Sequence, residues 1–297
     1  MPATESAPLF GIAEILGPLT PTIRVCAVGA MYGGEGHEPH DALITKGLCS
    51  VIGFEPIQAE CDRLNQLRGP VHRFLPYVIG DGRRRKFHVT NQTMTSSIYS
   101  PNGPLLKKFQ FLDDLTQVVA IQEIDTHRLD DLPEIAEVDF LKIDAQGATL
   151  DVLTGAERSL RGTVVVHAEA EFVTLYVGEP TFAEVDRLLR HQGFAFHKFA
   201  EIEGATFRPL HATTVSKPYF LGQQLWADVV YAKDFMRLAE VPPPKLRSLA
   251  VILHEIYRSV DFCAHALDVH DRVTGSDFWM PYVTRLTGER PPSRPDD

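Results

Sequence analysis

Acidic side chains stand at the ends of several short apolar runs in this sequence. Asp144 follows the run Phe140–Ile143, Glu55 follows a second run and precedes Pro56, and Asp81 lies in a Gly-Asp-Gly turn after a third run. In an open α/β sheet, ligands bind at the edge formed by the carboxyl ends of the strands. A carboxylate there can accept hydrogen bonds from ribose hydroxyls, as we expect of Glu55, or from an adenine amino group, as we expect of Asp81. The pattern therefore predicts a site for an adenosine-containing cofactor.

A glycine-rich turn follows the first apolar run, Ile23–Val28. Glycines allow backbone N–H groups to approach a bound ligand closely, so we expect this turn to contact the cofactor. The expected contacts in the turn are Gly29, Ala30, Met31 and Gly33. The same composition also serves ordinary tight loops, and the alternative interpretations are a loop carboxylate for Glu55 and a turn aspartate that bonds its own backbone for Asp81. The succession of strand, turn, helix, strand and acid favours ligand binding.

Two carboxylates and three histidines are candidates for a general base: Asp144, Glu169, His167, His37 and His40. A histidine titrates nearest neutral pH, which favours it over a carboxylate unless burial raises the pKa of the carboxyl group. Alternation along the run Thr163–Phe172 places His167 and Glu169 on one face of a strand. The alternatives are a core histidine bonded to Glu169 and, for His37, a plain polar loop. A divalent metal between Asp144, Glu169 and a histidine is conceivable, but no ligand spacing supports it, and we predict no metal site.

These residues fall on alternating segments of strand and helix character, which predict an α/β fold. The expected strands are residues 23–28, 50–55, 74–79, 138–144 and 163–172, followed by an antiparallel pair over 194–202 and 225–232. The expected helices are residues 8–19, a helix that runs from the fourth strand to about Leu160, 181–192 with Gly193 as its cap, and a long C-terminal helix over 246–267. The segment 83–125 is expected to be an insertion with a second strand over 118–124.

The same pattern predicts three parts of the chain: a lead-in over 1–20, the α/β domain over 21–235, and a helical extension over 236–297 that ends in a disordered tail. The Val-Pro-Pro-Pro stretch at 241–244 forms a stiff boundary before the extension. The apolar stripe of the C-terminal helix must pack against another surface. Docking on the core domain is the default, and covering the pocket or pairing with a second subunit as a homodimer are the alternatives.

Composition excludes several classes of function. The 297 residues carry 29 Lys plus Arg against 39 Asp plus Glu, a formal charge of -10, so no overall positive field attracts nucleic acid or anionic lipid. At 44% hydrophobic residues, the chain can bury a sizeable core. Its four cysteines are scattered without a Cys-x-x-Cys pair, and its first residues lack the features of a signal peptide. We expect a cytoplasmic protein with reduced thiols, no membrane span and a small-molecule substrate.

The stretch from Lys142 to Ala156 resembles the Lys-Ile-Asp-x-Glu-Gly-x-Glu segment of the FkbM-type methyltransferases. Its matching residues are Lys142, Ile143, Asp144, Gly147, Leu153, Gly155 and Ala156. The Gly29-Ala30 turn and the Phe54-Glu55-Pro56 stretch also resemble this family. The resemblance implies a Rossmann-like class I methyltransferase sheet, mostly parallel with an antiparallel last strand and helices on both faces. It implies S-adenosylmethionine as the cofactor, and it makes Ser96, Ser97 and Gln146 candidates for substrate binding.

Three positions depart from the family pattern, because Ala27, Gln146 and Thr149 stand where the family usually has acids. Three hypotheses follow. The preferred one is an O-methyltransferase that acts on a hydroxyl of a sugar or other natural-product small molecule. The second is an inactive, cofactor-binding relative or scaffold, which the three departures motivate. The third is a nicotinamide-dependent oxidoreductase, because a glycine turn and an acid after the second strand also suit that cofactor.

Overall fold

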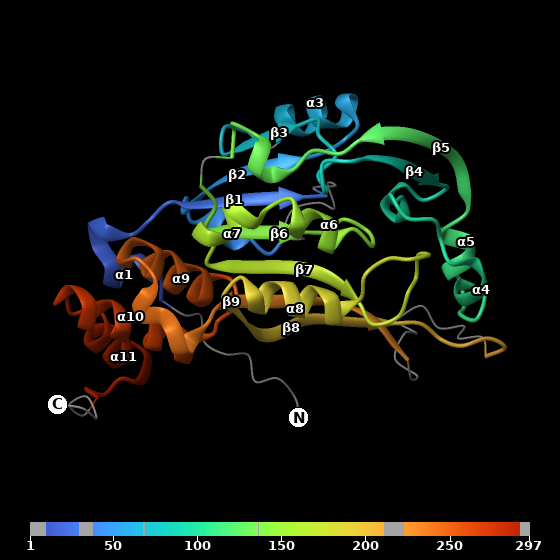
Figure 1. The fold of residues 1–297 in the computed structure, drawn as a ribbon. Helices are drawn as coiled ribbons and strands as arrows, with labels where there is room; N and C mark the ends of the chain where they lie inside the picture. The colour runs from blue at the N-terminus through green and yellow to red at the C-terminus, as the bar shows by residue number, and fades with distance from the viewer. Residues whose placement is uncertain (1–9, 30–37, 68, 136, 211–222, 292–297) are drawn as a thin grey trace. The chain divides into compact units, whose positions relative to one another are not determined.

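The computed structural model describes residues 10–29, 38–67, 69–135, 137–210 and 223–291 (Figure 1). The described residues fall into two compact units. The sheet unit is drawn from residues 24–34 and 50–234, and the helical unit from residues 1–23, 35–49 and 235–297. The three-part division expected from the sequence stays a prediction.

A seven-stranded sheet forms the centre of the sheet unit, in the order β3-β2-β1-β6-β7-β9-β8. Its strands are β1 (Ile23–Val28), β2 (Cys49–Phe54), β3 (His72–Leu75), β6 (Phe140–Ile143), β7 (Val165–Glu171), β8 (Phe194–Gly204) and β9 (Gln224–Lys233). The pairs β2–β3, β1–β6 and β6–β7 are parallel, whereas β9 is antiparallel to both β7 and β8. This mostly parallel sheet with an antiparallel end confirms the predicted fold class.

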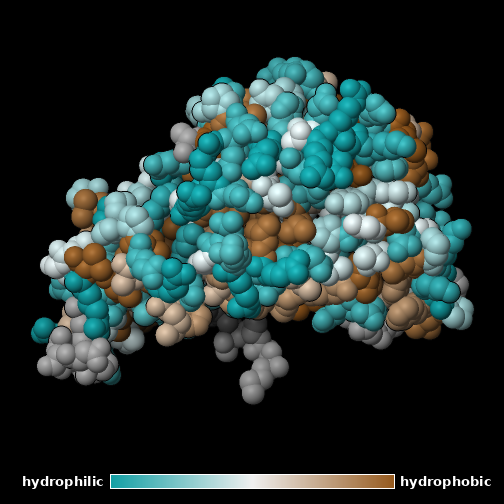
Figure 2. Space-filling view, in the orientation of Figure 1, coloured by the Kyte–Doolittle hydropathy of each residue, from teal (hydrophilic) through white to brown (hydrophobic). Residues whose placement is uncertain are grey.

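Three helices cover one face of the sheet: α6 (Thr149–Thr154), α7 (Glu157–Gly162) and α8 (Phe182–His191) (Figure 1). Their apolar side chains, among them Val152, Leu160 and Leu189, are fully buried against strand residues such as Leu141 and Val166. Burial of such side chains stabilises a fold by about 1.5–3 kcal/mol each. Figure 2 shows that the outer surface over this face is mainly hydrophilic, as amphipathic helices require.

The single helix predicted to run to about Leu160 is wrong, because α6 and α7 are separate helices with Gly155 between them. A Cβ atom at Gly155 would lie 2.2 Å from the carbonyl oxygen of Gly80, so only glycine lets the two backbones approach this closely. The second helix starts anew because Asp130 accepts hydrogen bonds from the N–H groups of Arg158 and Ser159, at 2.7 and 2.8 Å. A contact distant in sequence thus divides the helix.

The predicted insertion contains a two-stranded antiparallel ribbon of β4 (Arg84–Thr90) and β5 (Val118–Asp125), which confirms the second strand. The insertion also contains η2 (Thr93–Thr95), α4 (Gly103–Leu106) and α5 (Leu112–Leu115), whereas α3 (Gln58–Leu67) precedes it and η3 (Leu129–Asp131) follows it. β3 is shorter than predicted and ends at Leu75. Ile79, expected at its end, instead forms an isolated bridge with His127.

The helical unit contains α1 (Ala13–Leu16), η1 (Gly17–Leu19), α2 (Asp41–Thr45), η4 (Phe235–Glu240), α9 (Pro243–Glu255), α10 (Val260–Thr274) and α11 (Trp279–Thr287). The long helix predicted over 246–267 is wrong, because Arg258 at φ 49° reverses the chain between α9 and α10. The apolar stripe is the face along which these two helices pack, and Leu249, Leu253 and Leu267 are fully buried.

Buried polar contacts tie the N-terminal segment to α9 within the helical unit. Glu255 accepts a hydrogen bond from the N–H of Ile12 at 2.8 Å, and His254 Nε2 lies 2.7 Å from the carbonyl oxygen of Phe10. Neither contact was predicted from the sequence. In the part of the chain that the structure describes, every helix is too short or too polar to cross a bilayer. The tail predicted to be disordered lies almost wholly outside the described residues, which end at residue 291.

Candidate functional site

Three predicted site residues follow three consecutive strands of the sheet, β2, β1 and β6. Glu55 follows β2, Gly29 follows β1, and Asp144 follows β6, with its N–H donating to the carbonyl oxygen of Val28 at 3.0 Å. Gly29 has φ 76°, and a Cβ atom there would lie 1.9 Å from the carbonyl oxygen of Asp144. The first strand can therefore turn away from the sheet here only because residue 29 is glycine.

Glu55 is a buried carboxylate at this edge, with 4% of its surface exposed. One of its oxygens accepts a hydrogen bond from the N–H of Ile57 at 2.9 Å, and burial raises the pKa of its carboxyl group. Pro56, which ends the strand, is exposed. A buried acceptor beside a glycine turn fits the ribose and adenosine part of a cofactor. Four other expected residues, Ala30, Met31, Gly33 and His37, lie outside the described residues.

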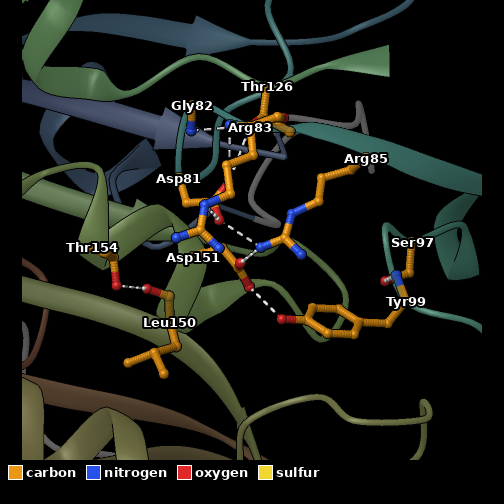
Figure 3. A network of polar contacts seen from close by, with 10 residues as sticks. All are labelled: Asp81, Gly82, Arg83, Arg85, Ser97, Tyr99, Thr126, Leu150, Asp151 and Thr154. Atoms are coloured by element: carbon orange, nitrogen blue, oxygen red, sulfur yellow. Dashed lines mark hydrogen bonds and ion pairs between the residues drawn. The ribbon is translucent and has the colours of Figure 1, made fainter. Parts of the chain in front are cut away.

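Asp81 belongs to a polar network that connects the β4–β5 ribbon to α6 (Figure 3). Its carboxylate accepts hydrogen bonds from Arg85 Nη2 at 2.5 Å and from the N–H of Arg83 at 3.1 Å. Arg85 also donates to Asp151 at 2.8 Å, and Asp151 accepts from the hydroxyl of Tyr99 at 2.8 Å. Asp81 thus has the turn arrangement that was the alternative interpretation, and its contact with adenine stays a prediction.

A row of charged side chains lies on one face of the central strands β6, β7 and β9. The strand register places Lys142 beside His167 and Glu169 beside Asp228. Lys142 Nζ lies 3.1 Å from Asp144 Oδ2, and His167 Nε2 lies 3.3 Å from Asp228 Oδ2. Burial raises the pKa of Asp228, but the hydrogen bond and charge of His167 outweigh it and hold that pKa below its usual range.

Glu169 is the most strongly perturbed acid of this row. Burial, followed by the negative charges of Asp144, Glu171 and Asp228, raises the pKa of Glu169 well above its ordinary value. Its Oε1 accepts a hydrogen bond from Gln146 Nε2 at 2.9 Å. A carboxylate of raised pKa binds a proton more strongly than an ordinary one does.

Gln146 stands between Glu169 and the insertion. Its backbone carbonyl accepts a hydrogen bond from Ser97 Oγ at 2.5 Å, and its Oε1 lies 3.3 Å from the hydroxyl of Tyr176. Tyr176 is buried, with 3% of its surface exposed, and its hydroxyl donates to the carbonyl oxygen of Thr95 at 2.9 Å. Ser96 instead accepts from the N–H of Thr90 at 3.1 Å, inside the ribbon.

Two further buried carboxylates converge on Gly147. Glu171 accepts a hydrogen bond from the N–H of Gly147 at 3.2 Å, and Glu179 accepts from the N–H of Tyr176 at 3.0 Å. A Cβ atom at Gly147 would lie 2.5 Å from Glu179 Oε2, so residue 147 must be glycine. Burial raises the pKa of Glu171 to about 7 and that of Glu179 to about 8, and in the latter case the charge of Glu171 contributes.

Sequence analysis therefore located the acids at the strand ends and missed the residues that position them. Lys142, Asp228, Tyr176 and Glu179 were not predicted to belong to the site. Lys142 and Asp228 face Asp144 and Glu169 through strand register, which only the alternation along each strand could have suggested. Within the described residues, no three His, Cys, Asp or Glu side chains are grouped as ligands of a metal ion.

A comparison with models of protein families gives a match that covers most of the sheet unit. Residues 28–196, more than half of the chain, match the family model described as the methyltransferase FkbM domain. The search of curated proteins finds no match. Among solved structures, the chain is similar to a putative methyltransferase from Thermoplasma acidophilum, at 9% identity over 74% of this chain and 71% of that one, with a TM-score of 0.36.

Two other solved structures are similar at the same level. Precorrin-6y C5,15-methyltransferase from Geobacter metallireducens GS-15 has 13% identity over 75% of this chain and 85% of its own, with a TM-score of 0.35. The N-terminal domain of EvdMO1, determined in the presence of SAH and D-fucose, has 11% identity over 75% of this chain and 79% of its own, with a TM-score of 0.33.

Proposed function

The chain belongs to the FkbM methyltransferase family and uses S-adenosylmethionine as its cofactor, and on this premise we propose that it methylates a hydroxyl group of a sugar or other natural-product small molecule. The family assignment groups the chain with methyltransferases rather than with nicotinamide-dependent oxidoreductases. The observation that carries the proposal is Glu169, a carboxylate of raised pKa one strand away from Asp144. Transfer to a hydroxyl requires a base, whereas transfer to an already nucleophilic atom does not.

The residues present at the sheet edge fit the cofactor. Glu55 offers a buried carboxylate for the ribose hydroxyls, and the turn that begins at Gly29 brings backbone close to the end of β6. Pro56 and Asp144 complete this edge, while contacts from Ala30, Met31, Gly33 and Asp81 remain part of the proposal. When bound, the cofactor supplies an electrophilic methyl group on a sulfonium.

Among the candidate bases, we assign the role to Glu169. His167 is 5% exposed, and its Nε2 is engaged by Asp228. Asp144 Oδ2 is engaged by Lys142 Nζ at 3.1 Å. Glu169 is half-buried, and of its two oxygens only Oε1 is bonded, to Gln146, among the described residues. The second oxygen is therefore available to a substrate hydroxyl.

Methyl transfer then needs only alignment and one proton acceptor. The hydroxyl proton passes to Glu169 as the acceptor oxygen forms its bond to the methyl carbon. The bound cofactor would supply the methyl group and keep the electron pair of its carbon–sulfur bond on sulfur. Ser97 and Gln146, which we propose to lie near the acceptor, act through their contacts with the β6 turn and Glu169. Ser96, which is bonded inside the ribbon, has a weaker claim to this role.

The departures from the family pattern support an active site rather than a degenerate one. Gln146 donates to the side chain of Glu169, and Thr149 Oγ1 donates to its backbone carbonyl at 2.7 Å. Both residues that replace an expected acid thus position Glu169. Two acidic side chains in their place would add negative charge beside a buried carboxylate, which is destabilising.

Two measurements test the proposed function. S-adenosylhomocysteine should raise the melting temperature by binding only the folded protein, while NADH should leave it unchanged. Methyl transfer from labelled S-adenosylmethionine should then be found with at least one member of a panel of hydroxylated sugars and natural products. Glu169→Gln should lose this transfer by about 100-fold or more and keep the thermal shift, since a general base contributes about 10²–10⁴ in rate.

The matched control is Glu201→Gln, because Glu201 is an exposed glutamate on β8. It should keep both the thermal shift and the transfer. Stabilisation by NADH without any shift from S-adenosylhomocysteine would contradict the proposal at the level of the cofactor. Full activity of Glu169→Gln would contradict the assignment of the base.

A further inference from the structure

A chain of polar contacts leads from Glu169 into the insertion. Glu169 Oε1 lies 2.9 Å from Gln146 Nε2, Gln146 Oε1 lies 3.3 Å from the hydroxyl of Tyr176, and that hydroxyl lies 2.9 Å from the carbonyl oxygen of Thr95. All four groups belong to the sheet unit. The amide of Gln146 can join both ends of this chain of contacts, because it carries a donor and an acceptor on two separate atoms that rotation exchanges.

The protons do not suffice for all these contacts while Glu169 is ionised. The hydroxyl of Tyr176 has one hydrogen and faces two acceptors, the carbonyl oxygen of Thr95 and Gln146 Oε1. The hydrogen can therefore lie in only one of the two contacts of the Tyr176 oxygen, the one with Thr95 or the one with Gln146. Gln146 and Thr95 are half-buried, so the missing hydrogen bond costs part of the free energy that a fully buried group would lose, and this state of the chain of contacts is incomplete.

Protonation of Glu169 together with rotation of the Gln146 amide satisfies every group. The carboxylic acid then donates to Gln146 Oε1, Gln146 Nε2 donates to the Tyr176 oxygen, and the Tyr176 hydroxyl donates to Thr95. Rotation exchanges two atoms of nearly equal size, so it requires no backbone movement. The same heavy-atom positions thus fit the protonated state better than the ionised one.

We propose that Gln146 is a positioning residue whose amide turns over when Glu169 takes up a proton, so that Tyr176 and Thr95 stabilise the protonated base. This inference rests on the proposed function for its catalytic meaning. In the reaction, the proton that leaves the acceptor hydroxyl binds to Glu169 Oε2 while the new carbon–oxygen bond forms, and rotation of the carboxylic acid group then turns its O–H toward Gln146. The hydrogen-bond chain then holds that proton until it passes to solvent.

The charged surroundings of Glu169 favour the same state. Asp144 at the end of β6, Glu171 on β7 and Asp228 on β9 all face it with negative charge, and Lys142 on β6 opposes them. Glu171 and Glu179 also lie near Tyr176, whose own pKa is raised by burial. Tyr176 therefore stays protonated and can only donate its hydrogen or accept another.

The first test is an infrared titration of the free protein, in which the carboxyl band of Glu169 is identified by its loss in Glu169→Gln. Tyr176→Phe should lower the midpoint of this band by about 0.7 pH unit, the size expected when one neutral hydrogen bond to the protonated state is lost. Tyr231→Phe is the matched control. It also removes a buried hydroxyl, which donates to Asp186 at 2.8 Å, and it should leave the midpoint unchanged.

A second measurement needs no substitution at Tyr176. In protein labelled at glutamine nitrogen, the side-chain amide protons of Gln146 should show a nuclear Overhauser contact with the ring of Tyr176 below the midpoint and lose it above. The resonance is assigned by its absence in Gln146→Met. A midpoint that Tyr176→Phe does not move, or an amide contact that is independent of pH, would overturn the proposal.

Both measurements use protein without methyl donor or acceptor, so their outcome is independent of turnover. A midpoint that moves in a protein that methylates no acceptor would retain the hydrogen-bond chain and refute the proposed function. Methyl transfer by a protein whose carboxyl midpoint is not moved by Tyr176→Phe would support the proposed function and refute the hydrogen-bond chain.

Discussion

The network around Arg85 allows a quantitative prediction. The Arg85 guanidinium bridges Asp81 and Asp151, whose side chains are 11% and 8% exposed, while Arg85 itself is 29% exposed. Arg85→Met removes the cation that bridges these two carboxylates and puts an unbranched apolar side chain in its place (Figure 3). Breaking a fully buried ion pair from one side costs about 3–5 kcal/mol. Because Arg85 is partly exposed, we expect a loss of about 2–4 kcal/mol in the free energy of unfolding at pH 7.

The matched control is Arg84→Met, one residue earlier on β4. Arg84 pairs with Glu123 at 3.1 Å, and both side chains are more than 60% exposed. Exposed pairs contribute about 0–1 kcal/mol, so this variant should unfold nearly as the natural protein does. Urea unfolding followed by far-ultraviolet circular dichroism measures both losses.

The pH dependence has a definite sign. Burial raises the pKa of Asp81, but the hydrogen bonds from Arg85 and Arg83 outweigh it and lower that pKa below its ordinary value. Its contribution to stability is thus present at neutral pH and lost as the pH falls through its folded-state pKa. In Arg85→Met the two carboxylates can be protonated instead of paired, so the loss should shrink as the pH falls from 7 toward 4. Equal losses for both arginine variants, or a loss that grows on acidification, would refute this reasoning.

Three further predictions follow from buried groups. Gly155→Ala should lower the free energy of unfolding by about 1–3 kcal/mol, because the added Cβ would lie 2.2 Å from the Gly80 carbonyl oxygen. Gly103→Ala is the control. No atom lies within 4 Å of its added Cβ, so it should unfold at the same urea concentration or higher. Glu179→Gln should be more stable than the natural protein at pH 9. Burial raises the pKa of Glu179 to about 8 in the folded state, so the natural protein loses stability as the pH rises from the pKa of Glu179 in the unfolded chain to about 8. A thiol reagent should modify the four buried cysteines far more slowly in native protein than in urea, and rapid native reaction would contradict their burial.

The sheet was predictable because its signals are local. Apolar runs such as Ile23–Val28, bounded by glycine or proline, define a buried strand whatever lies beside it. The two helix errors have a different origin. Gly155 divides α6 from α7 through its contact with Gly80, and Arg258 reverses the chain between α9 and α10 at a positive φ that few non-glycine residues adopt. Neither the contact of Gly155 with Gly80 nor the positive φ of Arg258 can be recognised from the neighbouring residues in the sequence.

The residues of the candidate site also differ in whether a local sequence pattern reveals them. Asp144 and Glu55 could be located because an acid directly after an apolar run is a local pattern. The partners of Glu169 and Gln146 could not, since Asp228 comes beside Glu169 by the antiparallel register of β9 on β7, and Tyr176 reaches Gln146 from a loop that follows β7. A single sequence therefore locates acids at strand ends more readily than the residues from distant segments that contact the candidate site.

Restoring the acid that the family usually has at position 146 should impair this protein. Gln146→Glu would replace a donor 2.9 Å from Glu169 Oε1 with a second carboxylate, and two carboxylates that close share a proton rather than ionise together. The proton-accepting form of Glu169 would then be populated only at higher pH, so the acid limb of the pH profile of kcat should move to higher pH. Gln122→Glu, at an exposed position of β5, serves as the control of equal charge change and should leave that limb in place. Greater activity of Gln146→Glu at neutral pH would mean that the base is not Glu169, and the inactive-relative hypothesis would regain its strongest support from Gln146.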